Sequence, residues 1–201
     1  AKICIMRILR LYTRLPPLKG GMENHIAQLS KEQTKLGHDV TIYFNKGTKV
    51  TSKDVQITKF PLYKLKPQFL GIVSFHFLVF LRIIANQEKF DIVHIHGDWS
   101  SLIFAMLIKK IVGSKKVIMS IHDELSGNFL PKKALSVLLK KVDVIFATGH
   151  GLASQLKKLT SKKVIVQPSG IRNIFFEQQP RSFDNKPLQV IIVANLVKKK
   201  N

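Results

Sequence analysis

Short apolar runs alternate along the chain with longer segments in which apolar residues recur at helical spacing. The apolar runs are rich in Ile and Val and rarely alternate with polar residues, which is typical of strands buried on both faces of a parallel sheet. Strands are predicted at Ile3–Leu9, Val40–Phe44, Val55–Phe60, Ile92–Ile95, Val117–Ile121, Val142–Ala147 and Val164–Gln167. Helices are predicted between them at Gly21–Leu36, Pro67–Asn86, Ser100–Ile111, Pro131–Lys140 and Gly151–Leu159. This succession predicts an α/β fold with a doubly wound, Rossmann-like and mostly parallel sheet flanked by helices.

The pattern changes near the C-terminal end of the chain. Residues 175–187 are polar and end at Pro187, as a linker between domains would. Leu188–Ala194 is a further apolar run of strand type with no helical segment after it. We therefore expect a first domain over residues 1–174, a linker over residues 175–187 and the truncated start of a second domain over residues 188–201.

Composition places the chain among globular proteins. With 201 residues and 45% apolar residues, it is long and apolar enough to bury a core. Its single cysteine, Cys4, excludes a disulfide framework. Arg7, Arg10 and Arg14 interrupt the apolar N-terminus, so no signal peptide is expected. No apolar stretch reaches the roughly 18 residues of a membrane-spanning helix.

The net charge of +21, from 33 basic and 12 acidic residues, indicates an anionic partner. Nucleic acid, an anionic membrane surface and a phosphorylated substrate all fit such a charge. Most of the basic residues are Lys, which acts as a point charge, whereas forked recognition of phosphates and bases uses Arg. A lysine-rich solvated surface explains the charge equally well, and the few arginines argue against nucleic acid.

The segment 69–84 is apolar almost all round and contains four phenylalanines. One interpretation is a core helix that covers the sheet. The alternative is an apolar surface that dips into a membrane, with Lys64, Lys66 and Lys89 beside it.

Residues able to carry chemistry gather just after the predicted strands. In open α/β sheets, ligands bind beyond the carboxyl ends of the strands. Gly20 and Gly21 precede a helix, and a glycine turn at a helix start favours phosphate binding. The other segments at this edge are His96-Gly97-Asp98, His122-Asp123-Glu124 and Pro168-Ser169-Gly170. His94, His96 and Asp98 resemble part of a metal motif, but Trp99 stands where a further histidine is wanted, so no metal is expected.

In their order and spacing these segments resemble the N-terminal half of a family 4 glycosyltransferase, the retaining type built from two Rossmann-like domains (the GT-B fold). The matching pieces are Gly20-Gly21-Met22-Glu23, Gly37-His38-Asp39-Val40, Asp91-Ile92-Val93-His94-Ile95-His96, Ser120-Ile121-His122, Val142-Asp143-Val144-Ile145-Phe146-Ala147 and Val166-Gln167-Pro168-Ser169-Gly170-Ile171. Val190–Asn201 is similar to the opening of the donor-binding domain, with Asn195 where the family has a phosphate-binding arginine.

The resemblance implies roles for individual residues. His122 would be the catalytic-site histidine that faces the transferred sugar. The other implied roles are acceptor binding by His96, Asp98 and Glu23, donor phosphate binding by Gly20, Gly21 and Lys200, and lining of the cleft by Asp123, Glu124, Ser169 and Gly170.

The expected function is therefore the acceptor-binding half of a cytoplasmic glycosyltransferase at the inner face of a membrane. It would move a sugar from a nucleotide-sugar co-substrate to a lipid-linked or glycan acceptor, with retention and without a metal or other cofactor. The 201-residue chain alone is expected to be inactive. A non-catalytic binding subunit of a two-chain enzyme and a basic nucleic-acid-binding domain remain as alternatives.

Overall fold

The structure is a computed structural model that describes residues 4–17, 20–47, 55–60, 68–97, 100–122 and 132–170. The described residues up to Ser169 belong to one compact unit, and the account that follows is of this unit by itself. Its elements are β1 (Arg7–Leu11), α1 (Gly21–Lys35), β2 (Asp39–Phe44), β3 (Gln56–Lys59), α2 (Gln68–Ala85), β4 (Ile92–His96), α3 (Ser100–Val112), β5 (Lys116–Ile121), α4 (Lys132–Leu139), β6 (Val144–Ala147), α5 (His150–Lys157) and β7 (Lys163–Val166).

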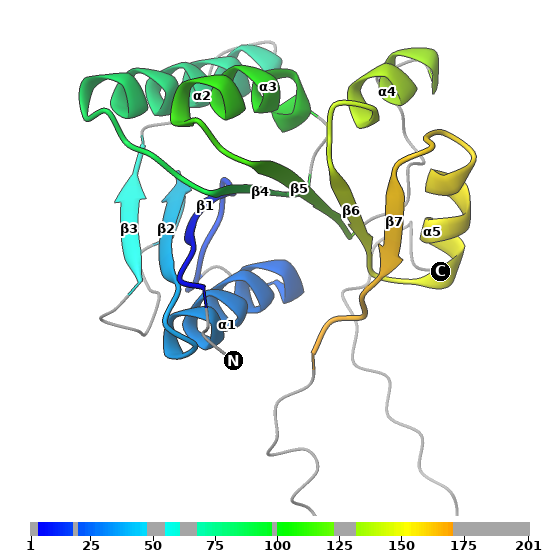
Figure 1. The fold of residues 1–201 in the computed structure, drawn as a ribbon, viewed down its shortest axis with the longest axis horizontal. Helices are drawn as coiled ribbons and strands as arrows, with labels where there is room; N and C mark the ends of the chain where they lie inside the picture. Colours follow the sequence, from blue (N-terminus) through cyan, green and yellow to red (C-terminus); the bar gives the residue numbers. More distant parts are fainter. Residues whose placement is uncertain are drawn as a thin grey trace, which may run out of the picture. The chain divides into compact units, whose positions relative to one another are not determined.

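The strands form one parallel sheet in the order β3-β2-β1-β4-β5-β6-β7 (Figure 1). From β1 the chain runs outwards to β2 and β3, then returns to the other side of β1 and continues to β7. Because parallel crossovers are right-handed, this reversal puts the helices on opposite faces of the sheet. α1 lies on one face, and α2 and α3 lie on the other (Figure 1). The predicted doubly wound Rossmann-like fold is confirmed.

Two clusters of buried apolar residues form the core between the sheet and its helices. The larger one joins the strands to α2, α3, α4 and α5, through residues such as Phe75, Leu102 and Leu139. The smaller one lies beneath α1 and contains Ile26 together with residues of β1 and β2. Strands in the middle of the sheet are thus buried on both faces, which explains their continuous apolar runs.

The predicted elements match the observed ones closely, with one informative exception. The first strand, predicted at Ile3–Leu9, is observed at Arg7–Leu11. Arg10 ended the apparent apolar run, but its side chain is fully buried within the sheet layer. The buried stripe of α1 also differs from its apolar pattern: Glu23, Ile26 and Ser30 are buried, whereas Leu36 is exposed.

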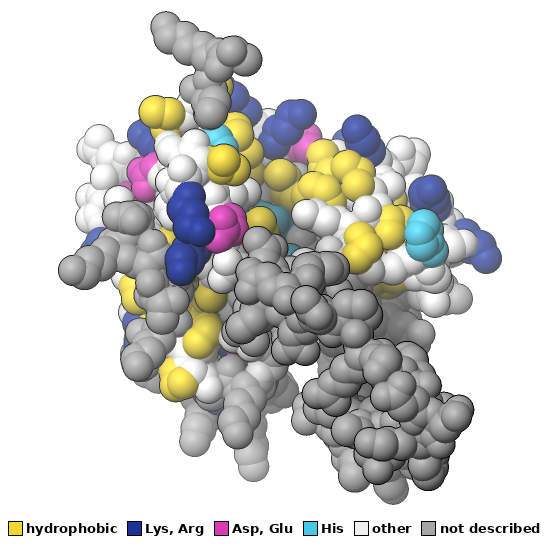
Figure 2. Space-filling model, turned by 90° about the horizontal axis from the view of Figure 1, so that it is seen from below, with side chains coloured by type: hydrophobic (Ala, Val, Ile, Leu, Met, Phe, Trp, Pro, Cys, Tyr) yellow, Lys and Arg dark blue, Asp and Glu magenta, His cyan; other side chains and the backbone are white. Residues whose placement is uncertain are grey.

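The surface carries both the excess of lysine and a set of exposed apolar side chains. On the face drawn in Figure 2, basic side chains are spread over several elements and do not form a single patch. α2 buries Phe75, Val79 and Ile83 against the sheet, while Phe77 and Leu81 are exposed on its outer side. Among the described residues, no helix combines the length and hydropathy needed to cross a membrane.

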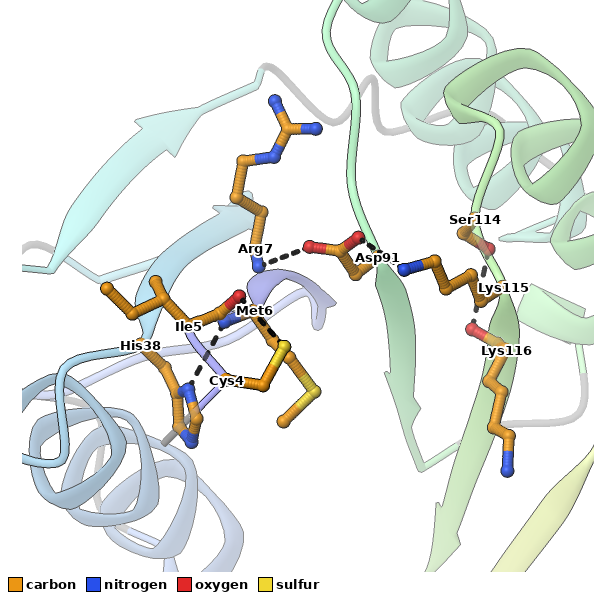
Figure 3. Close-up of polar contacts among 9 residues, drawn as sticks. All are labelled: Cys4, Ile5, Met6, Arg7, His38, Asp91, Ser114, Lys115 and Lys116. Atoms are coloured by element: carbon orange, nitrogen blue, oxygen red, sulfur yellow. Dashed lines mark hydrogen bonds and ion pairs between the residues drawn. The ribbon is translucent and has the colours of Figure 1, made fainter. Parts of the chain in front are cut away.

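Two aspartates tie neighbouring strands together at the amino ends of the sheet. Asp91, just before β4, accepts a hydrogen bond from the Arg7 N–H at 2.9 Å and lies 3.7 Å from Lys115 Nζ (Figure 3). Asp143, just before β6, accepts from the Val117 N–H at 2.7 Å and from Lys109 Nζ at 2.8 Å. Each carboxylate therefore joins the strand that follows it to the strand beside it.

These contacts lower the pKa of both carboxyl groups. The Arg7 N–H, with a smaller contribution from the Lys115 ammonium, holds the pKa of Asp91 below its usual value. Burial by itself raises the pKa of Asp143, but Lys109 and the Val117 N–H outweigh burial, so the net shift is downward. A carboxyl group whose pKa is lower in the folded state stabilises the fold above its unfolded-state pKa, and this stabilisation is lost as the pH falls.

Asp143→Ala is expected to lower the free energy of unfolding by about 1–2 kcal/mol at neutral pH, because the Val117 N–H loses its acceptor. Asp143→Asn, which keeps an acceptor oxygen, should lose less. Urea unfolding at a series of pH values measures both effects. The difference between the wild type and Asp143→Ala should shrink as the pH falls below the unfolded-state pKa of about 3.9. A constant difference down to about pH 2.5 would contradict this role of the carboxylate.

Candidate functional site

An open pocket of about 440 Å³ lies at the carboxyl ends of the strands. It adjoins the point where the strand order reverses, between β1 and β4, which is where open α/β sheets bind ligands. The segments that form it are far apart in the sequence and follow β1, β5, β6 and β7. Its lining residues are Tyr12, Arg14, Gly20, Gly21, Met22, Glu23, His122, Thr148 and Ser169.

The N-terminus of α1 forms one wall of the pocket. Gly20 is the N-cap residue and Gly21 the first helical residue, and no side chain caps this end. The unpaired N–H groups and the helix dipole make such an end favourable for an anion. Beside it, Arg14 Nε lies 2.9 Å from Glu23 Oε1, with Arg14 half exposed and Glu23 buried. The wall therefore combines a helix N-terminus with an ion pair in which the charges of Arg14 and Glu23 cancel.

The two glycines differ in how closely they are packed. A Cβ added to Gly20 would lie 1.9 Å from Glu23 Oε2, whereas a Cβ added to Gly21 would meet nothing within 4 Å. The Gly20 backbone is extended, so close approach and not backbone conformation requires glycine there. Gly20 is thus needed for the observed position of the Glu23 carboxylate.

Three histidines from different elements meet beside the pocket, and one of them, His122, lines it. The ring centroid of His122, which follows β5, is 5.4 Å from that of His25 on α1 and 6.1 Å from that of His96 on β4. Partial burial, and then the charge of Arg10, lower the pKa of His25. Burial and the neighbouring cationic groups also lower the pKa of His96 well below its usual value. The rings of His25 and His96 are therefore neutral at physiological pH.

Among the residues predicted from the sequence, Gly20, Gly21, Glu23, His122 and Ser169 line the pocket. His96 is buried behind the pocket wall, where its ring lies 6.5 Å from that of Tyr12. Gly170 is exposed and falls in the second unit of the chain. Asp98, Asp123, Glu124 and Lys200 lie outside the described residues, as do Lys64, Lys66 and Asn195.

Sequence reasoning missed Tyr12 and Arg14 as lining residues, and it placed Met22 and Thr148 after predicted strands without giving them a role. Thr148 follows β6 directly, so the strand-end rule already indicated it. Tyr12 and Arg14 follow β1 in the same way, but the predicted end of that strand came two residues too early. A buried arginine was not considered as part of a strand. In the part of the chain that the structure describes, no group of three or more His, Cys, Asp or Glu side chains could hold a metal ion.

The fold is an α/β domain of the Rossmann type, with a pocket at the carboxyl edge of its parallel sheet. The sequence profile of the family described as Glycosyltransferase Family 4 matches residues 19–172. The chain belongs to this family.

Curated relatives are similar over most of this chain. It is 23% identical over 192 residues to the phosphatidylinositol N-acetylglucosaminyltransferase gpi3 subunit of Schizosaccharomyces pombe, covering 90% of this chain and 42% of the relative. It is 25% identical over 199 residues to a phosphatidylinositol N-acetylglucosaminyltransferase subunit of Homo sapiens, covering 92% and 40%. The chain thus spans less than half the length of these relatives.

Solved structures support the fold. The catalytic domain of starch synthase IV from Arabidopsis thaliana, bound to ADP and acarbose, superposes with a TM-score of 0.63 at 16% identity, covering 85% of this chain and 53% of that one. Anabaena Alr3699/HepE in complex with UDP-glucose superposes with a TM-score of 0.60 at 13% identity, covering 87% and 47%. At these identities the likeness establishes the shared fold of the described sheet and helices.

Gly20→Ala is expected to displace the Glu23 carboxylate and break its ion pair with Arg14, because the new methyl group would overlap Glu23 Oε2. Gly21→Ala is the matched control and should leave both side chains in place. Crystal structures of the two variants would measure this directly. Since Glu23 can rotate away, unfolding free energies should stay within about 1 kcal/mol of the wild type. An unmoved Glu23 in Gly20→Ala would contradict the close-packing argument.

Proposed function

We propose that this chain is the N-terminal, acceptor-binding half of a glycosyltransferase. The enzyme would transfer a sugar from a nucleotide-sugar donor to a lipid-linked or glycan acceptor, with retention and without a metal. Residues 1–174 would form the acceptor-binding domain, residues 175–187 a linker and residues 188–201 the start of the donor-binding domain. The observation that carries the proposal is the polar pocket at the strand reversal in a chain of this family.

The donor side of the proposal rests on the N-terminus of α1. When a nucleotide-sugar reacts, negative charge develops on the leaving diphosphate and must be stabilised. The free N–H groups after Gly20 and Gly21 can do this without a metal ion, and Lys200 would add a cation from the donor half. That solved structures of the same fold hold ADP or UDP-glucose supports a nucleotide-linked donor.

The acceptor side rests on the other walls of the pocket. His122, with a neutral His25 beside it, would face the transferred sugar and the incoming hydroxyl. Glu23 would bind the acceptor together with Asp98, whereas His96, expected from the sequence to bind the acceptor, is buried and would support the wall formed by Tyr12 and His122. Asp123, Glu124, Ser169 and Gly170 would line the cleft. Phosphatidylinositol is the first acceptor to test, because it appears in the names of the curated relatives.

The enzyme would work at the inner face of a membrane, where a lipid-linked acceptor is exposed. The net charge of +21 favours an anionic lipid surface. The outer side of α2 exposes Phe77, Leu81 and Ile84, which can enter the boundary between head groups and acyl chains. Together they suggest reversible attachment without a spanning segment. Polysaccharide biosynthesis would be the cellular role if the acceptor is a glycan.

The direct test is sugar transfer by the full-length protein that contains this chain. Radiolabelled UDP- and ADP-sugars are offered with phosphatidylinositol vesicles, and labelled lipid is measured against reactions without acceptor. Labelled lipid or glycan supports the proposal, whereas transfer by the 201-residue chain alone would contradict the two-domain arrangement.

The relatives are named as subunits, so a non-catalytic binding subunit is the second candidate. Acceptor binding without transfer under all these conditions would favour it.

His122→Ala in the full-length enzyme is expected to lower kcat at least about tenfold, because its ring forms a wall of the reaction site. His38→Ala is the matched control, since His38 accepts from the Met6 N–H at the opposite edge of the sheet (Figure 3). Steady-state kinetics with thermal unfolding separate catalysis from folding. A wild-type kcat in His122→Ala would return this histidine to a structural role.

The chain is expected to bind vesicles that contain anionic lipid and to leave them as salt rises, since each lysine near the surface contributes about 1 kcal/mol. The double variant Phe77→Ser, Leu81→Ser should weaken binding by about tenfold. Val137→Ser, which removes a similarly exposed side chain from α4, should have little effect. Co-sedimentation at low and high salt measures this. Equal pelleting with neutral and anionic vesicles, or none with either, contradicts membrane attachment.

A further inference from the structure

A fully buried arginine lies beneath α1, one layer behind the pocket. Arg10 is on β1 and pairs in parallel register with His94 on β4. Side chains of paired residues lie on the same face of a sheet, so the guanidinium and the imidazole meet under the helix. On the helix side, Gln33 accepts a hydrogen bond from Arg10 Nη2. This contact explains why the buried stripe of α1 continues into polar residues.

The guanidinium determines which nitrogens of two histidines carry hydrogen. Arg10 Nη1 lies 3.1 Å from His94 Nδ1 and 3.0 Å from His96 Nε2. Because a guanidinium can only donate, both of these ring nitrogens must accept. Neutral His94 therefore carries its hydrogen on Nε2, which donates to Ser120 Oγ at 2.8 Å. Neutral His96 carries its hydrogen on Nδ1, which has no acceptor among the described residues.

The charge of Arg10 acts in the same direction as its hydrogen bonds. Burial lowers the pKa of Arg10 to about 9, so the side chain stays cationic at neutral pH. Within the described residues, no ion pair involves Arg10. Burial first, and then the surrounding basic groups Arg10, His25 and His122, lower the pKa values of His94 and His96 well below the usual value. A second proton on either ring would occupy the nitrogen that accepts from Arg10 and would abolish that hydrogen bond.

The histidine pair lies directly behind the pocket. The centroids of the His94 and His96 rings are 4.0 Å apart. The ring of His96 is 6.1 Å from that of His122, at an interplanar angle of 27°, and 6.5 Å from that of Tyr12. Both His122 and Tyr12 line the pocket. The ring of His96 therefore packs against two residues of the pocket wall, Tyr12 and His122, so a shift of His96 would displace them.

We propose that Arg10 is a positioning residue of the sugar-transfer site: it holds His94 and His96 in fixed neutral tautomers and so keeps the ring of His96 in place behind Tyr12 and His122. This inference rests on the proposed function, because the pocket it serves is the one assigned to sugar transfer. Arg10 itself does not line the pocket. Its effect on turnover passes through the histidine pair.

The first test reads the tautomers without any substrate. Two-bond ¹H–¹⁵N spectra of the 201-residue chain identify the protonated nitrogen of each histidine ring, with single His→Gln variants for assignment. In the wild type, His94 should be protonated on Nε2 and His96 on Nδ1, both without titration between about pH 5.5 and 8. His96 protonated on Nε2, or titrating in this range, overturns the proposal.

Arg10→Met is the decisive variant, because it removes the donor and the charge while keeping an unbranched side chain. His94 and His96 then lose their fixed tautomers, and their pKa values should rise because the charge of Arg10 is gone, while burial, the larger cause, still holds them below the ordinary value. In the full-length enzyme kcat should fall about tenfold, and the loss of rate on the acid side of the pH profile should move to higher pH than in the wild type. The groups facing His96 are Arg10, His94, His25 and His122, with Tyr12 at the pocket side.

Arg7→Met is the matched control, because Arg7 is on the same strand but its side chain is exposed. It should leave the tautomers and the pH profile unchanged. Arg10→Lys keeps a cationic donor and should restore part of the wild-type tautomer signals and part of the wild-type pH profile.

If Arg10→Met does not fold, Gln33→Leu loosens the guanidinium from the helix side and should change the tautomer signals in the same direction. Unchanged tautomers and an unchanged pH profile in the folded variant overturn the proposal. Because the spectra need no substrate, failure of the proposed function is distinguishable from failure of this inference.

Discussion

The reversal of strand order beside β1 is the constraint on which the rest of the structure depends. β1 begins the sheet, β2 and β3 add to one side of it, and β4 to β7 add to the other. Since all strands are parallel, every loop that follows a strand opens at the same edge. The reversal separates the helices that leave β1 and β4, and the pocket adjoins this point. Residues as distant in sequence as Arg14, His122 and Ser169 line one pocket because each follows a strand of this parallel sheet.

The central position of β1 also explains why the charge of Arg10 is buried. A central strand of a doubly wound sheet is covered on both faces, so any charge on it is removed from water. Within the described residues, hydrogen bonds to Gln33, His94 and His96 offset part of this cost, no carboxylate pairs with the charge, and Arg10 Nε has no partner. A neutral set of partners leaves the positive charge uncompensated beneath a pocket assigned to anionic and polar ligands. Burial first, and then this charge, lower the pKa values of His94 and His96 and keep both rings neutral.

The structure confirms one of the two interpretations that the sequence of α2 allows. Phe75, Val79 and Ile83 face the sheet, which confirms a core role. Phe77, Leu81 and Ile84 are exposed, so the helix is apolar all round because its outer side carries apolar side chains as well. Core packing accounts for only one of these two sides.

The sequence by itself determined the order and type of every described element. Continuous runs of Ile and Val indicate strands buried on both faces, and apolar residues at helical spacing indicate helices with one buried side. It also indicated the site edge, since glycine and histidine follow the buried strands. Only the tertiary structure decided that Arg10 belongs to β1, that Glu23 packs against Gly20, and that His25, His96 and His122 meet. These features depend on register between distant strands and on how closely α1 approaches the sheet. A one-dimensional pattern records which residues are apolar, but a buried polar side chain is explained only by the partners that the fold brings to it.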